Sequence, residues 1–166
     1  MENQKKNFEY KLDKEITSLF KEPDMLAYAK PAKNISYSDF FDDKMLVIAA
    51  IRAGIPYSMF DVIQDNAPFT EDNWADFLDI STKSLQRYKT SEAFHFKAIH
   101  SEKILEMAEV TSIGLDVFGS MEKLKLWLNT PSYALGNLKP IELIKDSYGK
   151  ELVISELTRI NYGILV

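Results

Sequence analysis

The sequence has no cysteine, few glycines and prolines, and no long hydrophobic run. Its 166 residues include only six glycines and six prolines. Without cysteine the chain can form no disulfide and no thiolate metal site, and such a composition fits a reducing cytoplasm. No apolar run approaches the roughly 20 residues of a membrane-spanning helix, and residues 1–6 lack the apolar stretch of a signal peptide. We therefore expect a cytoplasmic protein with no membrane partner.

The chain also has no excess of positive charge, and its charges are unevenly distributed along the sequence. The net charge is −5, which argues against a strong general affinity for nucleic acid. Between positions 81 and 103, however, five basic residues accompany two acidic ones, whereas positions 70–80 hold four acidic residues and no basic one. A local basic surface of this kind can still bind DNA, with strong sensitivity to salt.

Helical periodicity dominates the apolar pattern. Alternation of period two is limited to the short segment Phe94-His95-Phe96. With 46% hydrophobic residues, the chain can bury the core of one domain or of two small ones. We predict an all-α fold, in which a helix-turn-helix bundle is followed by a small helical domain.

The first forty residues have the weakest pattern. Leu12, Ile16 and Leu19 recur at helical spacing and predict a helix over 9–20, and Pro23 and Pro31 interrupt the chain after it. We interpret residues 1–40 as a partly ordered N-terminal arm. It precedes the two domains that we place at 41–100 and 101–166.

Capping residues and helix breakers divide the next fifty residues into four predicted helices. Asp42-Asp43 favours the start of the first, and Gly54 favours its end. Proline suits the first turn of a helix, and a serine or threonine hydroxyl can cap one. On these rules the other three helices begin at Pro56, at Thr70, and at Ser81 or Thr82.

The third and fourth of these helices have the order of apolar residues that a helix-turn-helix needs. Trp74 and Leu78 lie one turn apart, small Ala75 permits a close crossing, and Asp79 occupies the turn. The alternative is an ordinary helical hairpin with a solvated face, and the pattern alone does not separate the two. If the second helix enters a major groove, the residues predicted to contact DNA are Ser81, Thr82, Lys83, Gln86, Arg87 and Lys89.

The C-terminal third predicts one long helix and several short ones. The long helix runs from Ser101 to Phe118 and ends at Gly119, after which Ser120 can cap the next. A short helix opens at Pro140, and we expect Tyr148-Gly149 to end it. The last helix places Val153, Leu157 and Ile160 on one side and Arg159 outside.

Residue sets that carry catalysis or bind metals are missing. Positions 114–119 imitate the glycine spacing of a phosphate loop but lack its lysine, and they continue the helical pattern. His95 and His100 are five residues apart rather than the four of a zinc-binding helix. We expect no enzyme activity, no metal and no cofactor.

Many separate spacings of the chain from about position 51 agree with one known family. It resembles the antitoxins of the Xre/MbcA/ParS family, the partners of RES-domain toxins in type II toxin-antitoxin systems. Upstream, the matching segments are 53–55 and 81–87, which are similar to that family's Xre-type helix-turn-helix. Downstream, the matching positions are 101–105, Phe118-Gly119, Trp127-Leu128, Pro131, Leu135-Gly136, 140–143, Gly149, Leu157, Arg159-Ile160 and Tyr162-Gly163.

The resemblance implies an antitoxin whose C-terminal domain binds a RES toxin. Such toxins resemble ADP-ribosyltransferases and consume NAD, and the end of the antitoxin would cover the toxin's active site. The implied partners are the cognate toxin, operator DNA of its own operon and a second copy of the chain, forming a homodimer. The residues expected to bind the toxin are Arg159, Tyr162, Gly163, Ile164, Leu165 and Val166.

Trp127 is better explained as a core residue than as a toxin contact. The alternative function is a helix-turn-helix transcriptional regulator that has no toxin partner, since the helix-turn-helix pattern alone would suffice for it.

Overall fold

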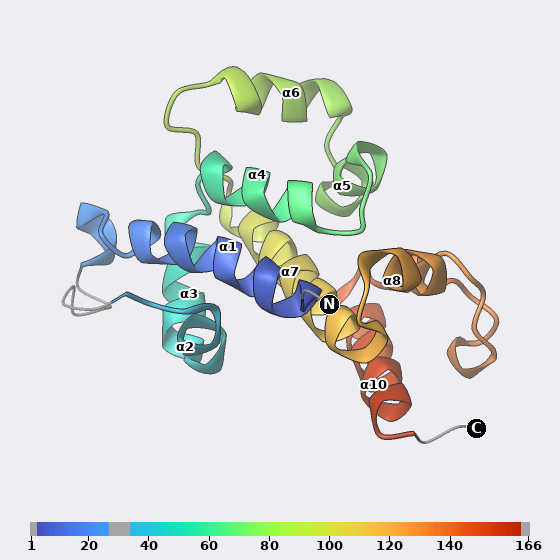
Figure 1. Ribbon diagram of the computed structural model, residues 1–166. Helices are drawn as coiled ribbons and strands as arrows, with labels where there is room; N and C mark the ends of the chain where they lie inside the picture. The colour runs from blue at the N-terminus through green and yellow to red at the C-terminus, as the bar shows by residue number, and fades with distance from the viewer. Residues whose placement is uncertain (1–2, 27–33, 164–166) are drawn as a thin grey trace.

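The computed structural model describes residues 3–26 and 34–163, and these residues form an all-α fold (Figure 1). They contain ten α-helices, two 3₁₀ turns and no strand. The only bridges of β type within this part of the chain join Pro56 to His95 and Ser132 to Leu138. The predicted fold class is therefore confirmed.

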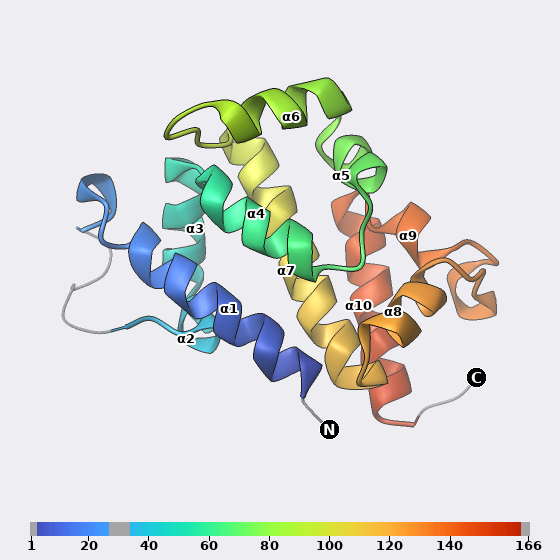
Figure 2. The same cartoon turned by 45° about the horizontal axis from the view of Figure 1, so that its top comes forward.

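Helix α7 (Ala98–Phe118) is the centre of the molecule. It packs against six other helices: α1 (Gln4–Leu19), α3 (Lys44–Ala53), α4 (Tyr57–Asn66), α5 (Glu71–Leu78), α8 (Met121–Leu128) and α10 (Ser147–Asn161). Figures 1 and 2 show it running through the middle of the fold. Because neighbours lie on several sides of it, its buried residues include Ile104, Leu105, Met107, Ala108, Val110 and Thr111.

The N-terminal segment is part of this core rather than an arm beside it. Helix α1 begins five residues earlier than predicted and packs against α2 (Tyr37–Asp42), α4 and α7. Its side chains at Phe8, Leu12 and Ile16 are at most 3% exposed. The interpretation as a partly ordered arm is corrected for α1, because a helix whose apolar residues repeat every three or four positions gains stability by burying them. The sequence pattern also missed α2.

The four helices predicted between 42 and 90 are all present. Asp43 caps α3, Thr70 caps α5 and Ser81 caps α6 (Thr82–Thr90), in each case by accepting a hydrogen bond from a backbone N–H of the first turn. Gly54 ends α3 with a φ of +91°. Aromatic rings fill the space between these helices: Phe60 meets Trp74 edge-on at 5.2 Å between centroids and Phe96 at 5.0 Å.

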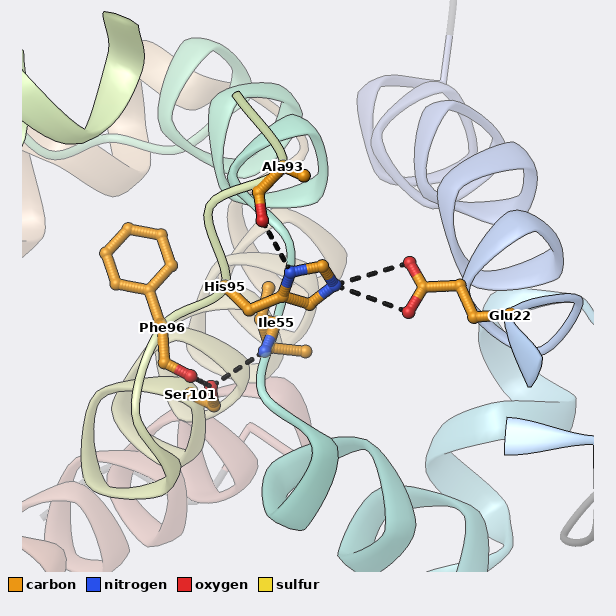
Figure 3. Close-up of polar contacts among 6 residues, drawn as sticks. All are labelled: Glu22, Ile55, Ala93, His95, Phe96 and Ser101. Atoms are coloured by element: carbon orange, nitrogen blue, oxygen red, sulfur yellow. Dashed lines mark hydrogen bonds and ion pairs between the residues drawn. The ribbon is translucent and has the colours of Figure 1, made fainter. Parts of the chain in front are cut away.

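Ser101 ties the loop between α3 and α4 to the start of α7 (Figure 3). Its buried hydroxyl accepts a hydrogen bond from the Ile55 N–H at 2.8 Å and donates one to the Phe96 carbonyl at 3.3 Å. The Phe96 N–H in turn donates to the Ile55 carbonyl at 2.9 Å. A Cβ on Gly54 would collide with that same Phe96 carbonyl. The sequence pattern placed Ser101 at the helix start, but α7 begins three residues before it.

A second contact in Figure 3 joins the N-terminal segment to the loop between α6 and α7. The imidazole of His95 lies between the Ala93 carbonyl, at 3.0 Å from Nδ1, and the Glu22 carboxylate, at 3.3 Å from Nε2. Glu22 directly precedes the 3₁₀ turn Pro23–Met25. The loop before α7 is therefore held from two sides.

The C-terminal domain is a layer of short helices on α7. Helix α8 is followed by the 3₁₀ turn Tyr133–Leu135, by α9 (Pro140–Leu143) and by α10. The prediction that Tyr148-Gly149 ends the helix opened at Pro140 is wrong, because both residues lie in the first turn of α10. A Cβ on Gly149 would collide with the Leu143 carbonyl. The glycine thus allows α10 to cross closely over α9 and ends no helix.

Charged side chains lie within the packing of α7 against α9 and α10. Lys103 Nζ is 3.6 Å from Glu106 Oε2, and Lys150 Nζ is 3.3 Å from Glu109 Oε1. Burial raises the pKa of the Glu106 carboxyl above its usual value, and the charges of Lys103 and Lys150 oppose that rise only in part. Burial therefore disfavours the charged form of Glu106 at this interface.

Replacing Ser101 by alanine removes the hydroxyl while leaving the Ile55 N–H buried without that acceptor. A buried donor without a partner costs about 1–3 kcal/mol. We expect Ser101→Ala to lower the free energy of unfolding by that amount in urea titrations, with Ser155→Ala on the exposed side of α10 as the control. Equal unfolding free energies for Ser101→Ala and the wild type would contradict this role of the hydroxyl.

Replacing Glu106 by glutamine should stabilise the protein at pH 7. A carboxyl whose pKa is higher in the folded than in the unfolded chain lowers stability once the pH exceeds the unfolded value, about 4.3 for glutamate. The stabilising effect of Glu106→Gln should therefore shrink as the pH falls towards 4. Urea unfolding at both pH values measures it, with exposed Glu151→Gln on α10 as the control. A gain that grows at low pH would refute the assignment.

Candidate functional site

The predicted DNA-contacting residues lie along α6 and at its cap, Ser81. Five of them, Ser81, Lys83, Gln86, Arg87 and Lys89, are exposed, and Thr82 is half-buried. Leu85 is buried and fixes the helix on the core. At about 100° per residue, Lys83 and Arg87 lie on the far side of the helix from Leu85, whereas Lys89 lies one turn after it. The helix therefore presents these polar side chains outwards, as a recognition helix must.

The turn before α6 has the geometry of a helix-turn-helix. Asp79 adopts the left-handed conformation, with φ 53° and ψ 47°, and the Ile80 N–H donates to the Ala75 carbonyl at 3.0 Å. Aspartate tolerates this conformation better than most residues. Ser81 then uses its hydroxyl as the cap, accepting from the Ser84 N–H at 3.1 Å. Of the predicted DNA contacts, Ser81 is thus already engaged within the chain.

Acidic side chains of α5 border this surface. The Gln86 amide donates to the Glu71 carboxylate at 3.3 Å, which places a negative charge beside the polar face of α6. Asp76 forms an ion pair with Lys145 at 2.8 Å, a contact between α5 and the loop before α10. Arg87 lies 5.6 Å from the ring centroid of Tyr88, within cation–π distance. The basic charge of α6 is therefore partly offset at its edge.

The second predicted set lies at the end of α10. Tyr162 is 76% exposed, and Gly163, with φ +70°, follows the end of the helix. Arg159 is half-buried, and its Nη1 donates to Glu156 Oε2 at 2.8 Å. Ile164, Leu165 and Val166, the rest of the predicted set, lie outside the described residues.

The two predicted sets are separate in space. Both views place α6 at one end of the molecule and the end of α10 at the other (Figures 1 and 2). The structure thus brings together the members of each set and keeps the two sets apart.

Two family profiles match adjacent parts of the chain. Residues 46–109 match the antitoxin Xre-like helix-turn-helix domain, and residues 114–163 match the antitoxin Xre/MbcA/ParS C-terminal toxin-binding domain. The chain belongs to the Xre/MbcA/ParS antitoxin family. Its helix-turn-helix, α5 and α6, lies within the first matched domain, and α8, α9 and α10 lie within the second. An antitoxin of this family acts by binding and not by catalysis.

A solved structure shares the antitoxin fold. A chain of the crystal structure of the M. tuberculosis MbcT-MbcA toxin-antitoxin complex superposes with a TM-score of 0.52 at 18% identity, covering 64% of this chain and 94% of that chain. At this identity the likeness concerns the fold alone. No curated protein sequence matches the chain at a significant level.

The toxin-binding domain of this antitoxin has an exposed apolar surface that the sequence pattern did not reveal. Eleven large hydrophobic side chains are exposed in the described part of the chain, and six of them lie between 114 and 163: Leu126, Tyr133, Leu138, Tyr148, Leu152 and Tyr162. In a domain of fifty residues this is a high share. The exposure of Tyr148 and Leu152 could have been predicted from their helical positions, which lie away from the apolar stripe of Val153 and Leu157.

Trp127 belongs to the core of this antitoxin, as the sequence analysis preferred. Its ring packs on Phe118 with centroids 5.6 Å apart, and it is half-buried against the main cluster.

Among the described residues, no helix has the length and hydrophobicity that crossing a membrane requires.

Proposed function

We propose that this antitoxin neutralises a RES-domain toxin, a NAD-consuming relative of ADP-ribosyltransferases, by covering its active site with the end of the chain. The single observation that carries the proposal is the match of residues 114–163 to a toxin-binding domain. The exposed ring of Tyr162 at the end of α10 supports it, because an aromatic residue that contacts little of its own chain can bury a large area in a partner. The similar fold in the MbcT-MbcA complex is consistent with the same class of partner.

To bind the toxin, Arg159 would have to give up or share an ion pair that it already makes within the chain. Its guanidinium must leave Glu156, or share it, to reach an anion-binding part of the toxin pocket. Glu156 is 13% exposed, so it would remain with little access to water if Arg159 moved away. We therefore expect Arg159 to contact the toxin from its present position along α10. Tyr162, Gly163 and the three residues after them, Ile164, Leu165 and Val166, would then enter the pocket.

We also propose that the helix-turn-helix represses the antitoxin's own operon as a homodimer. The exposed polar face of α6 supports DNA contact through Lys83, Gln86 and Arg87. The distance between α6 and the end of α10 supports simultaneous binding of DNA and toxin, since neither surface blocks the other (Figures 1 and 2). The negative charge of Glu71 at the edge of the α6 surface predicts a modest affinity for DNA, which falls steeply as the salt concentration rises. A cytoplasmic location follows from these two partners.

A stop after Asn161 separates neutralisation from folding. This truncation removes Tyr162, Gly163 and the three residues beyond them but leaves α10 complete to its last residue. We expect cells that co-express the RES-domain toxin encoded beside this chain to stop growing and to lose NAD with the truncated form. The full chain should protect them, and circular dichroism should show equal helix content. Full protection by the truncated chain would contradict occlusion by the chain end. A full chain that neither protects nor co-purifies with the toxin would leave the alternative, a transcriptional regulator without a toxin.

Charge variants of the helix-turn-helix test the DNA contact. We expect Arg87→Ala to weaken binding to the chain's own promoter by about 1–3 kcal/mol and to reduce the salt slope by about one. Glu71→Gln should tighten binding, because it removes the negative charge beside Gln86. Lys125→Ala on exposed α8 is the control. Gel shifts over a range of salt concentrations measure all three, and no shift of the wild type at low salt would rule out the repressor role.

A further inference from the structure

The outward side of α10 carries a stripe of large side chains. Tyr148 is 84% exposed, Leu152 is 55% exposed and Tyr162 is 76% exposed. At about 100° per residue, Tyr148, Leu152, Arg159 and Tyr162 fall within an arc of about 80°, and the small side chain of Ser155 lies in the same arc between Leu152 and Arg159. From Tyr148 to Tyr162 the stripe covers fourteen residue steps, or about 21 Å along the helix axis. It therefore joins the first turn of α10 to the predicted toxin contacts at its end.

The core of the protein does not account for this stripe. The side of α10 that packs on α7 carries Val153 and Leu157, both 0% exposed. Those residues lie about 140–180° around the helix from Tyr148. A helix that buries one side normally has polar residues on the other. The outer side of α10 instead carries two tyrosines and a leucine, as expected of a helix that contacts apolar surfaces on both sides.

The predicted chain-end contacts are too small to form an interface by themselves. A specific, stable protein interface buries about 800 Å² per partner and involves about 20–30 residues on each side. The predicted set is Arg159, Tyr162 and the residues after it, six in all. A large aromatic side chain can bury about 150–250 Å². Tyr148 and Leu152 would therefore add a substantial share of the missing area on the same helix face.

We propose that the toxin binds α10 lengthwise, with Tyr148 and Leu152 docked in an apolar groove that leads to the toxin's active site. This proposal rests on the proposed antitoxin function and extends its interface from the chain end to the whole outer face of α10. The mode is that of an amphipathic helix in a groove, with anchors one turn apart. Tyr148 and Leu152 supply affinity, and the chain end supplies inhibition.

The position of the stripe favours the toxin over a second copy of the chain as its occupant. Tyr148, Leu152 and Tyr162 all lie within the matched toxin-binding domain, and Arg159 continues the stripe into the predicted toxin contacts. A symmetric dimer through this face would cover Tyr162 and block the end that inhibition requires. The stripe also lies away from α6, where a DNA-binding dimer has to place its two recognition helices.

The experiment compares two double variants of the full chain. Tyr148→Ser with Leu152→Ser removes the two anchors, and Tyr10→Ser with Ile99→Ser removes a tyrosine and an isoleucine of similar exposure, 75% and 72%, outside the toxin-binding domain. The probe is the purified RES-domain toxin encoded beside this chain. Its Kd is measured by titration calorimetry and its NAD hydrolysis is followed at increasing antitoxin concentration. Circular dichroism and thermal unfolding verify that both variants fold.

We expect the stripe variant to raise the Kd at least tenfold and the control to leave it within twofold of the wild type. At saturating concentration the stripe variant should still inhibit NAD hydrolysis completely, because its chain end is intact. A stripe variant with the wild-type Kd overturns the inference and leaves the proposed function standing. An unchanged Kd together with lost self-association in sedimentation would assign the stripe to a second copy and also overturn it. If the wild-type chain does not bind the toxin, the proposed function is wrong, and the inference that rests on it is wrong as well.

Discussion

The burial of most of α7 is the constraint on which the rest of the structure depends. Six helices contact it, and its buried residues include Ser101, Thr111 and Ser112 as well as aliphatic side chains. Polar groups in such a position must find partners inside the protein. Ser101 finds the Ile55 N–H and the Phe96 carbonyl, and Thr111 donates to the Met107 carbonyl at 2.8 Å. The partners of Ser101 lie in the loops at either end of the segment α4–α6, so the packing of one helix helps to set the position of the DNA-facing surface.

The same helix connects the two functional parts of the antitoxin. The matched helix-turn-helix domain packs on α7 through α3, α4 and α5, and the toxin-binding domain packs on it through α8 and α10. No flexible linker separates the two matched domains, because residues 110–113 between them belong to α7. The Asp76–Lys145 ion pair adds a direct link between them, but both side chains are more than half exposed and such pairs contribute little. The rigid connection therefore comes from apolar packing, and it holds the two surfaces at opposite ends.

Each of the two surfaces has a different physical character. The α6 surface is polar and weakly basic, with Glu71 at its edge, so long-range attraction and salt should govern its contacts. The α10 surface is apolar, and its tyrosines also carry hydroxyl groups, a combination common in protein interfaces. These differences match a nucleic-acid partner at one end and a protein partner at the other.

The sequence by itself determined the fold class, the family resemblance and the helix ends marked by caps and breakers such as Asp43, Gly54, Thr70 and Ser120, because these residues act through neighbouring backbone groups. It also placed the turn at Asp79. Only the tertiary structure decided which residues serve packing and which stay exposed. In the folded protein α1 is part of the core, and Gly149 allows α10 to cross closely over α9. Ser81 and Arg159 form hydrogen bonds within the chain, and Tyr148 and Leu152 remain exposed. Those outcomes depend on contacts between residues far apart in sequence, which periodicity along one helix does not contain.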